Sequence, residues 1–199
     1  MSPSLDASTQ KVTSIRHINN ITFGFICPVQ TPEGQKIGVV KSLAMMSTIT
    51  NMNTSQKIIL QNILFEFKNY THPYDINPLD MNKWSKIIFN GDWGGCTKSI
   101  VDLYTLLIQK KNNNILDKYT SICLDYEEKE LKVYYDAGRL IRPLINVKNN
   151  LPLITPEIIK EVDFFLKTDI SKGWNQLMSR HPNIISYEDI ENTKFIMSA

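Results

Sequence analysis

The clearest periodic pattern lies in the middle of the chain, where apolar residues recur at three- and four-residue steps. The residues on this face are Ile100, Leu103, Tyr104, Leu107 and Ile108. Such spacing places them on one side of a helix, which we expect to cover roughly residues 99–111. Three consecutive asparagines at 112–114 predict the end of this helix.

Period-two alternation and turn residues predict strands on both sides of this helix. Residues 84–93 form two short apolar runs around Asn90-Gly91. This pair predicts a two-residue hairpin, because both central positions of the turn need a positive φ. Residues 121–135 predict a second hairpin, in which a charged connection joins two strands and apolar residues alternate on one face.

The remaining segments give weaker patterns. Residues 56–68 are apolar enough to be buried, but their spacing leaves helix and strand equally open. A further helix is predicted to begin at Thr155, because threonine can cap a helix and Pro156 fits its first position. Residues 147–152 are interpreted as a linker, and residues 1–13 as a loop or frayed tail.

These elements together predict a mixed α and β chain of the α+β class. A short helix and a final strand are expected after Gly173. The predicted divisions are an irregular segment over residues 1–50 and two small mixed domains over residues 51–148 and 149–199.

Composition excludes several classes of protein. The chain has 42% hydrophobic and 21% charged residues, so global disorder is not expected. No apolar run reaches the roughly 20 residues that cross a bilayer, and the N-terminus lacks the apolar core of a secretory signal. The net charge is only +2, which does not indicate a coat for nucleic acid. Residues 1–60 are mildly basic, with five Lys or Arg and two acids, so if nucleic acid is bound we expect the contact there.

The cysteines predict neither a disulfide framework nor a metal site. Cys27, Cys96 and Cys123 are far apart, no CxxC pair exists, and the three histidines show no HxxxH spacing. A zinc site within this chain is therefore not expected, and reduced thiols in an intracellular protein are the simplest interpretation.

The segment from Gly24 to Ala44 has an unusual density of turn-forming residues. Its distinctive positions are Cys27, Pro28, Thr31, Pro32, Gly34, Gly38 and Lys41. Such a loop is rigid, and it can hold Glu33 and Lys41 in fixed positions while its glycines allow another backbone to approach closely. These residues alone leave open whether the loop serves a ligand or is only a tight connection.

The string CPVQTPEGQKIGVVKSLA, preceded by Arg16-His17 and Phe23-Gly24, resembles the fork region of the second-largest, beta-type subunit of multisubunit DNA-directed RNA polymerases. Two more motifs of that family follow in the same order. FNGDWGG at 89–95 resembles its hairpin, and EKELKV, DAGR and RPL between residues 128 and 144 resemble the stretch after it. The resemblance is strong up to residue 148 and weaker beyond, and its details favour the eukaryotic, archaeal and large-DNA-virus branch.

The resemblance implies a place in a larger protein. Residues 1–50 would be the C-terminal part of the fork domain, residues 51–148 an external 1-like domain, and residues 149–199 an external 2-like domain. The chain would be a fragment of a longer subunit and inactive as an isolated enzyme. It would lie in the nucleus or a cytoplasmic viral factory, with packaging into the virion left open.

The resemblance also implies cofactors and partners. Such polymerases transfer nucleotides with two Mg²⁺ ions held mainly by the largest subunit, so no metal is expected to bind this chain alone. The expected partners are the largest subunit, the other polymerase subunits, template DNA, RNA and nucleoside triphosphates, with no membrane.

Arg16 and Glu33 are the residues that this position would place beside the active centre. Arg16 would direct charge toward a phosphate or a mobile catalytic element, and Glu33 would anchor that network. The alternative is an Arg16–Glu33 pair that only holds the loop. Gln30 departs from the acid often found before TPEG, which puts a role for that carboxylate in doubt.

Other residues have simpler interpretations. His17 is expected to be a packed loop histidine and Cys27 a buried small hydrophobe. Lys41 would contact a nucleic-acid backbone or remain a free surface lysine. The residues expected to be structural are Asn90, Gly91, Asp136, Gly138, Arg139 and Arg142, with Asp136 and Arg139 paired to each other or to backbone.

Two other functions compete with a polymerase subunit. One is a free-standing, truncated paralogue that binds polymerase or nucleic acid. The other is a thiol hydrolase, which would require Cys27 and His17 to converge with a third, orienting group. If the chain is part of a polymerase, faces that contact other domains should appear as exposed apolar patches.

Overall fold

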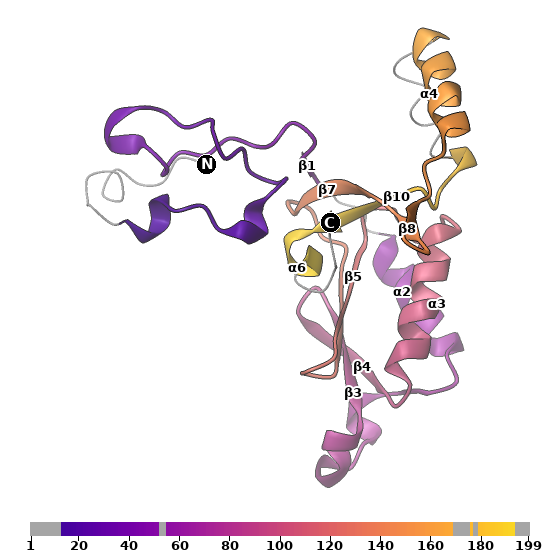
Figure 1. Cartoon of the computed structure of the whole chain (residues 1–199). Helices are drawn as coiled ribbons and strands as arrows, with labels where there is room; N and C mark the ends of the chain where they lie inside the picture. The colour runs from indigo at the N-terminus through magenta and orange to yellow at the C-terminus, as the bar shows by residue number, and fades with distance from the viewer. Residues whose placement is uncertain (1–12, 52–54, 169–175, 177–178, 194–199) are drawn as a thin grey trace.

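The computed structural model describes residues 13–51, 55–168, 176 and 179–193. An N-terminal arm extends to one side of a body built around a sheet, and a helix projects from the body at the upper right (Figure 1). The predicted tail at residues 1–13 and the elements expected after Gly173 fall largely or wholly outside the described residues.

A five-stranded mixed sheet forms the body, with the strand order β2-β4-β3-β6-β5. Its strands are β2 (Tyr70–Thr71), β3 (Ser85–Phe89), β4 (Asp92–Thr97), β5 (Ser121–Asp125) and β6 (Glu130–Tyr134). Only β3 and β6 run parallel, and the other neighbours are antiparallel. The predicted second hairpin is thus confirmed as β5 and β6, and the sheet agrees with the expected α+β class.

Two helices supply the other half of the core. They are α2 (Gln56–Glu66) and α3 (Ile100–Asn112), and short 3-10 helices at Pro73–Asp75 and Pro78–Lys83 lie between β2 and β3. The buried cluster takes residues from both helices, from three strands and, with Leu116, from the connection between α3 and β5; its members are Leu60, Ile63, Leu64, Ile87, Phe89, Leu103, Leu107, Leu116, Ile122, Leu124, Leu131 and Val133. The periodic pattern of α3 is confirmed. The structure decides the open segment at 56–68 in favour of a helix, because one side of it packs into this cluster.

The Asn90-Gly91 hairpin is also confirmed, and its turn makes a further contact with the second hairpin. Asn90 has φ 48° and Gly91 φ 93°, as a tight turn between β3 and β4 requires. The side-chain oxygen of Asn90 also accepts a hydrogen bond from the N–H of Tyr135 at 2.9 Å. The turn residue therefore ties the first hairpin to the end of the second.

A smaller sheet joins segments that are far apart in the sequence. Strand β7 (Leu140–Ile145) lies between β1 (Thr48–Ile49) and β10 (Ile185–Asp189), and it is antiparallel to both. Each of the three predicted divisions of the chain thus contributes one strand to this sheet. A four-residue helix, α6 (Ile190–Thr193), follows β10 directly.

The linker predicted at residues 147–152 is wrong, because this segment is a small hairpin. Strand β8 (Val147–Lys148) pairs with β9 (Leu151–Pro152), and the turn between them has φ 52° at Asn149 and 62° at Asn150. Asparagine tolerates positive φ better than most residues, so Asn-Asn can form a tight turn. The predicted helix after Thr155 is confirmed as α4 (Pro156–Thr168), which projects from the body (Figure 1).

Arg139, just before β7, links three parts of the chain. Its guanidinium lies 3.0 Å from the Asp136 carboxylate and 3.1 Å from that of Asp189, and it donates to the carbonyl of Tyr119 at 2.9 Å. The expected pairing of Asp136 and Arg139 is therefore confirmed. Thr50 binds the same turn, since its hydroxyl donates to the Asp136 carbonyl at 3.0 Å and accepts from the Arg139 N–H at 3.1 Å.

Arg139→Met should lower the free energy of unfolding by about 3–5 kcal/mol, because it leaves the Asp189 carboxylate buried without its cation. The matched control is Asp136→Ala at the other end of the same guanidinium. The Asp136 side chain is 53% exposed, so its loss should cost less than about 1 kcal/mol. Urea unfolding of the chain measures both, and equal losses would contradict the assignment of Arg139 as a buried link to β10.

Candidate functional site

The arm that contains the proline- and glycine-rich loop is closed at its base by backbone hydrogen bonds. Ile26 and Leu43 form an antiparallel bridge. The N–H of Cys27 donates to the carbonyl of Ser42 at 2.9 Å, and the N–H of Ala44 donates to the carbonyl of Phe25 at 3.0 Å. Residues 27–42 therefore leave and return at one point, which fixes the loop as a unit on the arm (Figure 1).

The side chain of Arg16 holds the far side of this loop by binding backbone carbonyls of the loop. It ends a short 3-10 helix (Ser14–Arg16), and its Nη1 atom donates to the carbonyls of Gln35 at 2.9 Å and Ile37 at 2.7 Å. The arm has another 3-10 helix at Asn20–Thr22, and the loop itself turns through a third (Gly34–Lys36). A positively charged guanidinium bound to two carbonyls stabilises that turn.

Gly38 lets the two backbones meet. Its φ is +71°, and a Cβ atom there would lie 2.8 Å from the carbonyl oxygen of Arg16. The close approach that was expected of the loop glycines thus occurs at Gly38. Gly34 also has a positive φ, of +80°, but no atom lies near the position of its missing Cβ. Gly34 is required for its conformation alone, and Gly38 for both reasons.

The Thr31 hydroxyl crosses the loop. It accepts a hydrogen bond from the Gly38 N–H at 2.8 Å and donates to the Val40 carbonyl at 3.3 Å. This contact fixes the stretch between them, on which Glu33 is exposed. Within the described residues, no ion pair joins Glu33 to Arg16, so the simple pairing considered from the sequence is not found.

The predicted residues of the loop fall into two groups. One group lines a cavity of about 160 Å³, and it contains Arg16, Cys27, Pro28, Thr31, Gly38 and Lys41. Pro32, Glu33 and Gly34 do not line it, and they lie in the exposed outer part of the loop. The structure therefore brings Arg16 and Lys41 to one cavity and leaves Glu33 free to meet another molecule or domain.

Two expectations about side chains on the arm are wrong. Cys27 is half-buried rather than buried, and its sulfur accepts a hydrogen bond from the N–H of Gln30 at 3.4 Å. This N–H, followed by that of Val29, lowers the pKa of the Cys27 thiol. His17 is exposed rather than packed, and it follows the first 3-10 helix in extended backbone. No hydrogen bond between Cys27 and His17 occurs in the described part of the chain, so the contact that a thiol hydrolase requires is missing there.

Arg142 on β7 joins the arm to the body. It is 7% exposed, its Nη1 atom donates to the carbonyl of Phe23 at 2.9 Å, and its Cζ atom lies 5.1 Å from the ring centre of buried Phe25. Between them Gly24 has φ +78°, and a Cβ there would lie 2.7 Å from Nη1. The sequence predicted Arg142 as structural but did not indicate its partner. The aromatic residues around Gly24 were the only signal.

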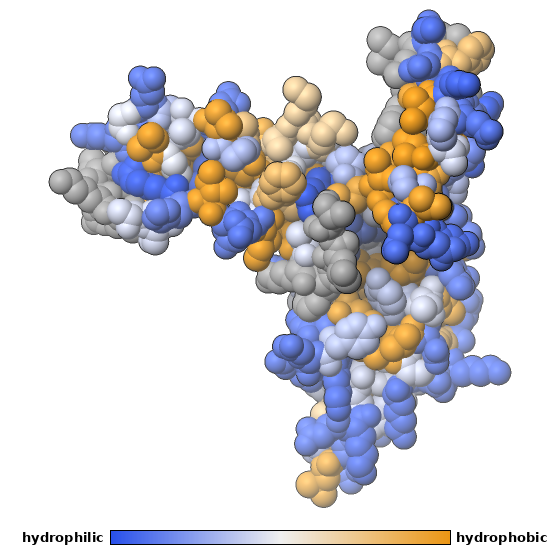
Figure 2. Space-filling view, viewed as in Figure 1, coloured by the Kyte–Doolittle hydropathy of each residue, from blue (hydrophilic) through white to orange (hydrophobic). Residues whose placement is uncertain are grey.

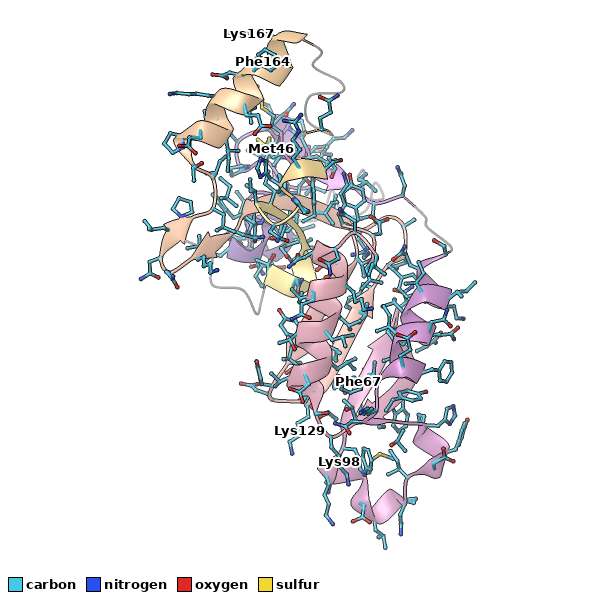
Figure 3. The ribbon with its side chains drawn as sticks, turned by 90° about the vertical axis from the view of Figure 1, so that its right-hand side faces the viewer. Met46, Phe67, Lys98, Lys129, Phe164 and Lys167 are labelled. Atoms are coloured by element: carbon cyan, nitrogen blue, oxygen red, sulfur yellow. The ribbon has the colours of Figure 1, made fainter. Side chains whose placement is uncertain are left out.

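The arm also exposes large apolar side chains, as expected for a surface that meets other domains. Phe23 is 74% exposed, Val29 83% and Met45 98%. Figure 2 shows apolar residues at several places along the arm, and Figure 3 shows Met46 on the arm, far from Lys98 and Lys129 at the other end of the molecule. Exposed apolar area of this kind marks interaction sites on proteins.

Neither a metal-binding cluster nor a membrane-spanning helix is found in the part of the chain that the structure describes. Those residues contain no group of three or more histidine, cysteine or acidic side chains placed to hold a metal ion. Among their helices, none has the length and apolar character needed to cross a bilayer.

Comparisons with known proteins agree on one family. Residues 1–49 match the family model described as RNA polymerase Rpb2, domain 3, and residues 87–148 match RNA polymerase Rpb2, domain 4. These matches contain the closed loop of the arm, the Asn90-Gly91 hairpin, and the turn and strand that carry Arg139 and Arg142.

Curated relatives extend the similarity over the whole chain. The chain is 34% identical to DNA-directed RNA polymerase subunit 2 of Acanthamoeba polyphaga mimivirus, over 100% of its own length and 16% of that protein. It is 33% identical to DNA-directed RNA polymerase II subunit RPB2 of Encephalitozoon cuniculi, over 95% of the chain and 16% of that protein. It is 31% identical to DNA-directed RNA polymerase subunit Rpo2 of Saccharolobus shibatae, over 74% of the chain and 14% of that protein. The chain thus spans about one sixth of the length of these relatives.

Replacing Gly34 and Gly38 separately by alanine distinguishes the strain of a positive φ from the steric clash with the backbone of Arg16. Gly34→Ala should cost about 1–2 kcal/mol for a left-handed residue, and Gly38→Ala should cost that plus the clash with Arg16. We expect hydrogen exchange at the amide of position 38 to be about tenfold faster, or more, in Gly38→Ala than in Gly34→Ala. Equal exchange in the two variants, measured by mass spectrometry of peptides from residues 31–43, would contradict the packing of Arg16 against the loop.

The three cysteines should differ sharply in reactivity. Burial raises the pKa of the Cys123 thiol to about 12 and also raises that of Cys96, whereas the pKa of Cys27 lies below the ordinary thiol value. Because the thiolate is the reactive form, iodoacetamide should alkylate Cys27 first, and its rate should level off at a lower pH than that of an ordinary thiol. Peptide mass spectrometry follows all three, with the chain in denaturant as control. Labelling of Cys96 or Cys123 as fast as Cys27 in the folded chain would overturn this assignment.

Proposed function

We propose, since this chain belongs to the family of second-largest subunits of DNA-directed RNA polymerases, that it forms part of the active-centre fork and the adjoining outer domains of such an enzyme. The enzyme would synthesise RNA on a DNA template, with this chain shaping the site rather than performing chemistry alone. The observation that carries the proposal is the closed loop at residues 27–42. Its TPEG motif lies within the matched domain 3. The guanidinium of Arg16 and the hydroxyl of Thr31, the first residue of that motif, fix the loop through hydrogen bonds.

Within this loop we assign different roles to the two charged residues singled out from the sequence. Arg16 is a positioning residue, because its Nη1 atom is bound to the carbonyls of Gln35 and Ile37. Glu33 is exposed on the outer part of the loop, where its carboxylate can bind a mobile element of the polymerase. Lys41 lines the inner cavity with Arg16, and it would add positive charge on the side that faces nucleic acid or nucleotide.

Polymerases of this family imply Mg²⁺, and the described residues do not fit a magnesium site. They lack a cluster of acidic side chains that could hold the ion. We therefore assign no metal-dependent step to this chain and propose that the ions belong mainly to the largest subunit. The largest subunit, the other polymerase subunits, template DNA, RNA and nucleoside triphosphates are the proposed partners, in the nucleus or a cytoplasmic viral factory.

Co-purification from the source cells or virus tests this proposal. An antibody raised against residues 84–144 should recover the largest polymerase subunit and template-dependent RNA synthesis, which magnesium chelation should abolish. The same antibody shows the size of the native polypeptide, which we expect to be far larger than the 22.9 kDa of this chain.

Recovery of a free chain without other polymerase subunits and without RNA synthesis would refute the proposal. If that free chain bound DNA with a steep dependence on salt, the competing interpretation as a separate nucleic-acid-binding module would replace it. An antibody against an unrelated protein of the same cells serves as the control for nonspecific recovery.

A further inference from the structure

Arg142 carries a buried positive charge that has no acidic partner among the described residues. The salt bridges of that part of the chain do not include it, although its side chain is 7% exposed. Its Nη1 atom donates to the carbonyl of Phe23, but its Nε atom is buried without a hydrogen-bond partner. One edge of the guanidinium is therefore unused, although burial of an unpaired charge and an unpaired donor is unfavourable.

The two acids on the neighbouring strand β10 have other partners. Glu188 faces Arg142 across the β7–β10 pair, yet its carboxylate accepts a hydrogen bond from the side chain of Asn192. Burial raises the pKa of Glu188, and the opposing effect comes first from Lys111 and not from Arg142. Asp189, the next residue, binds Arg139. The ring of Phe25 compensates part of the charge of Arg142, but a cation–π contact at 5.1 Å leaves the Nε–H unsatisfied.

A cavity that Arg142 lines lies where the arm meets the body. Its volume is about 370 Å³, and its lining includes Ile18, Asn19, Phe23, Pro28, Arg142 and Thr193. The exposed part of the lining is mixed: Ile18 is 59% and Phe23 74% exposed, and the side chains of Asn19 and Asn20 are exposed beside them. Arg142 is the only charged residue among the described residues that line it. Figure 1 shows that the arm leaves the body next to β1 and β7.

We propose that this cavity is a docking site for an aspartate or glutamate side chain, carried on an apolar segment of the assembled polymerase that lies outside these 199 residues. The carboxylate would bind the Nε edge of Arg142 in a bidentate manner, and the neighbours of the acid would cover Ile18 and Phe23. The inference rests on the proposed function, because the occupant belongs to the rest of the polymerase. Relatives are about six times longer than this chain, so most of the protein that could supply it lies outside these residues.

The chemistry of the cavity favours a carboxylate on protein over a phosphate of nucleic acid. Arginine binds both anions through its planar edge. Binding to a nucleic-acid backbone, however, usually relies on several cations along one groove, whereas the described lining of this cavity offers one arginine, with the apolar side chains of Ile18 and Phe23 beside it. A single buried charge surrounded by apolar contacts is typical of the centre of a protein–protein interface.

Photo-crosslinking in the assembled polymerase tests the proposal. Phe23 on the rim is replaced by a photoreactive benzoylphenylalanine in the full-length subunit, and crosslinked peptides are identified by mass spectrometry. The expected product is a peptide with an aspartate or glutamate flanked by apolar residues. Arg142→Met should lower the yield about tenfold or more, because it removes a charge-assisted bidentate contact. The control Lys148→Met, at an exposed position in the β8–β9 hairpin, should leave the yield unchanged.

A charge exchange then identifies the acid. Arg142→Glu should abolish the crosslink, and arginine at the aspartate or glutamate of the crosslinked peptide should restore it. If Arg142→Met prevents assembly, Arg142→Lys decides, because lysine keeps the charge but lacks the planar edge, and an unchanged yield would refute bidentate binding. Crosslinks to DNA or RNA, or to a peptide without an acid, would also overturn the proposal. Failure of the wild-type subunit to join a polymerase would instead refute the proposed function.

Discussion

Strand β7 and the two arginines beside and within it constrain the rest of the structure. β7 pairs with β1 on one side and β10 on the other, so backbone hydrogen bonds join three segments of the chain. Arg139 fixes the turn before this strand to β10 and to the carbonyl of Tyr119, and Arg142 holds the arm through the carbonyl of Phe23. A buried arginine requires partners, so any shift of the arm or of β10 would leave a charge or a carbonyl unsatisfied.

The same sheet connects the arm to the end of α3. Lys111, in the last turn of α3, donates to the carbonyl of Tyr187 on β10 at 3.4 Å. Burial lowers the pKa of Lys111 and raises that of Glu188, and the two charges favour each other. The packed body and the small sheet are thus coupled through buried polar groups, whose separation would cost free energy. Such coupling suits a subunit that must hold a loop in a fixed position within a larger assembly.

The arm is built differently from the body, and the difference agrees with the proposed function. The body has a buried cluster drawn from helices and strands, whereas the arm relies on backbone hydrogen bonds, a threonine hydroxyl and the guanidinium of Arg16. Its large apolar side chains are largely exposed, and Phe23 and Met45 are examples. An arm of this kind gains apolar burial only when other domains cover it. Its loop is shaped in advance, and its surface is left for partners.

Local interactions were predictable from the sequence, and interactions between distant segments were not. Asn90-Gly91 determined its hairpin, and the spacing of Leu103 and Leu107 determined α3, because both depend on backbone preferences and periodicity within a few residues. The motif from Cys27 to Lys41 indicated a rigid loop and a polymerase family. The β8–β9 hairpin was missed because Asn149-Asn150 indicates a turn but does not specify the strands on either side of it. The exposure of His17 and the partial burial of Cys27 depend on how the arm folds back. Only the tertiary structure decided that β7 lies between β1 and β10 and that the Nε atom of Arg142 has no partner. Partners about 40 residues away or more leave no periodic or local signal in the sequence.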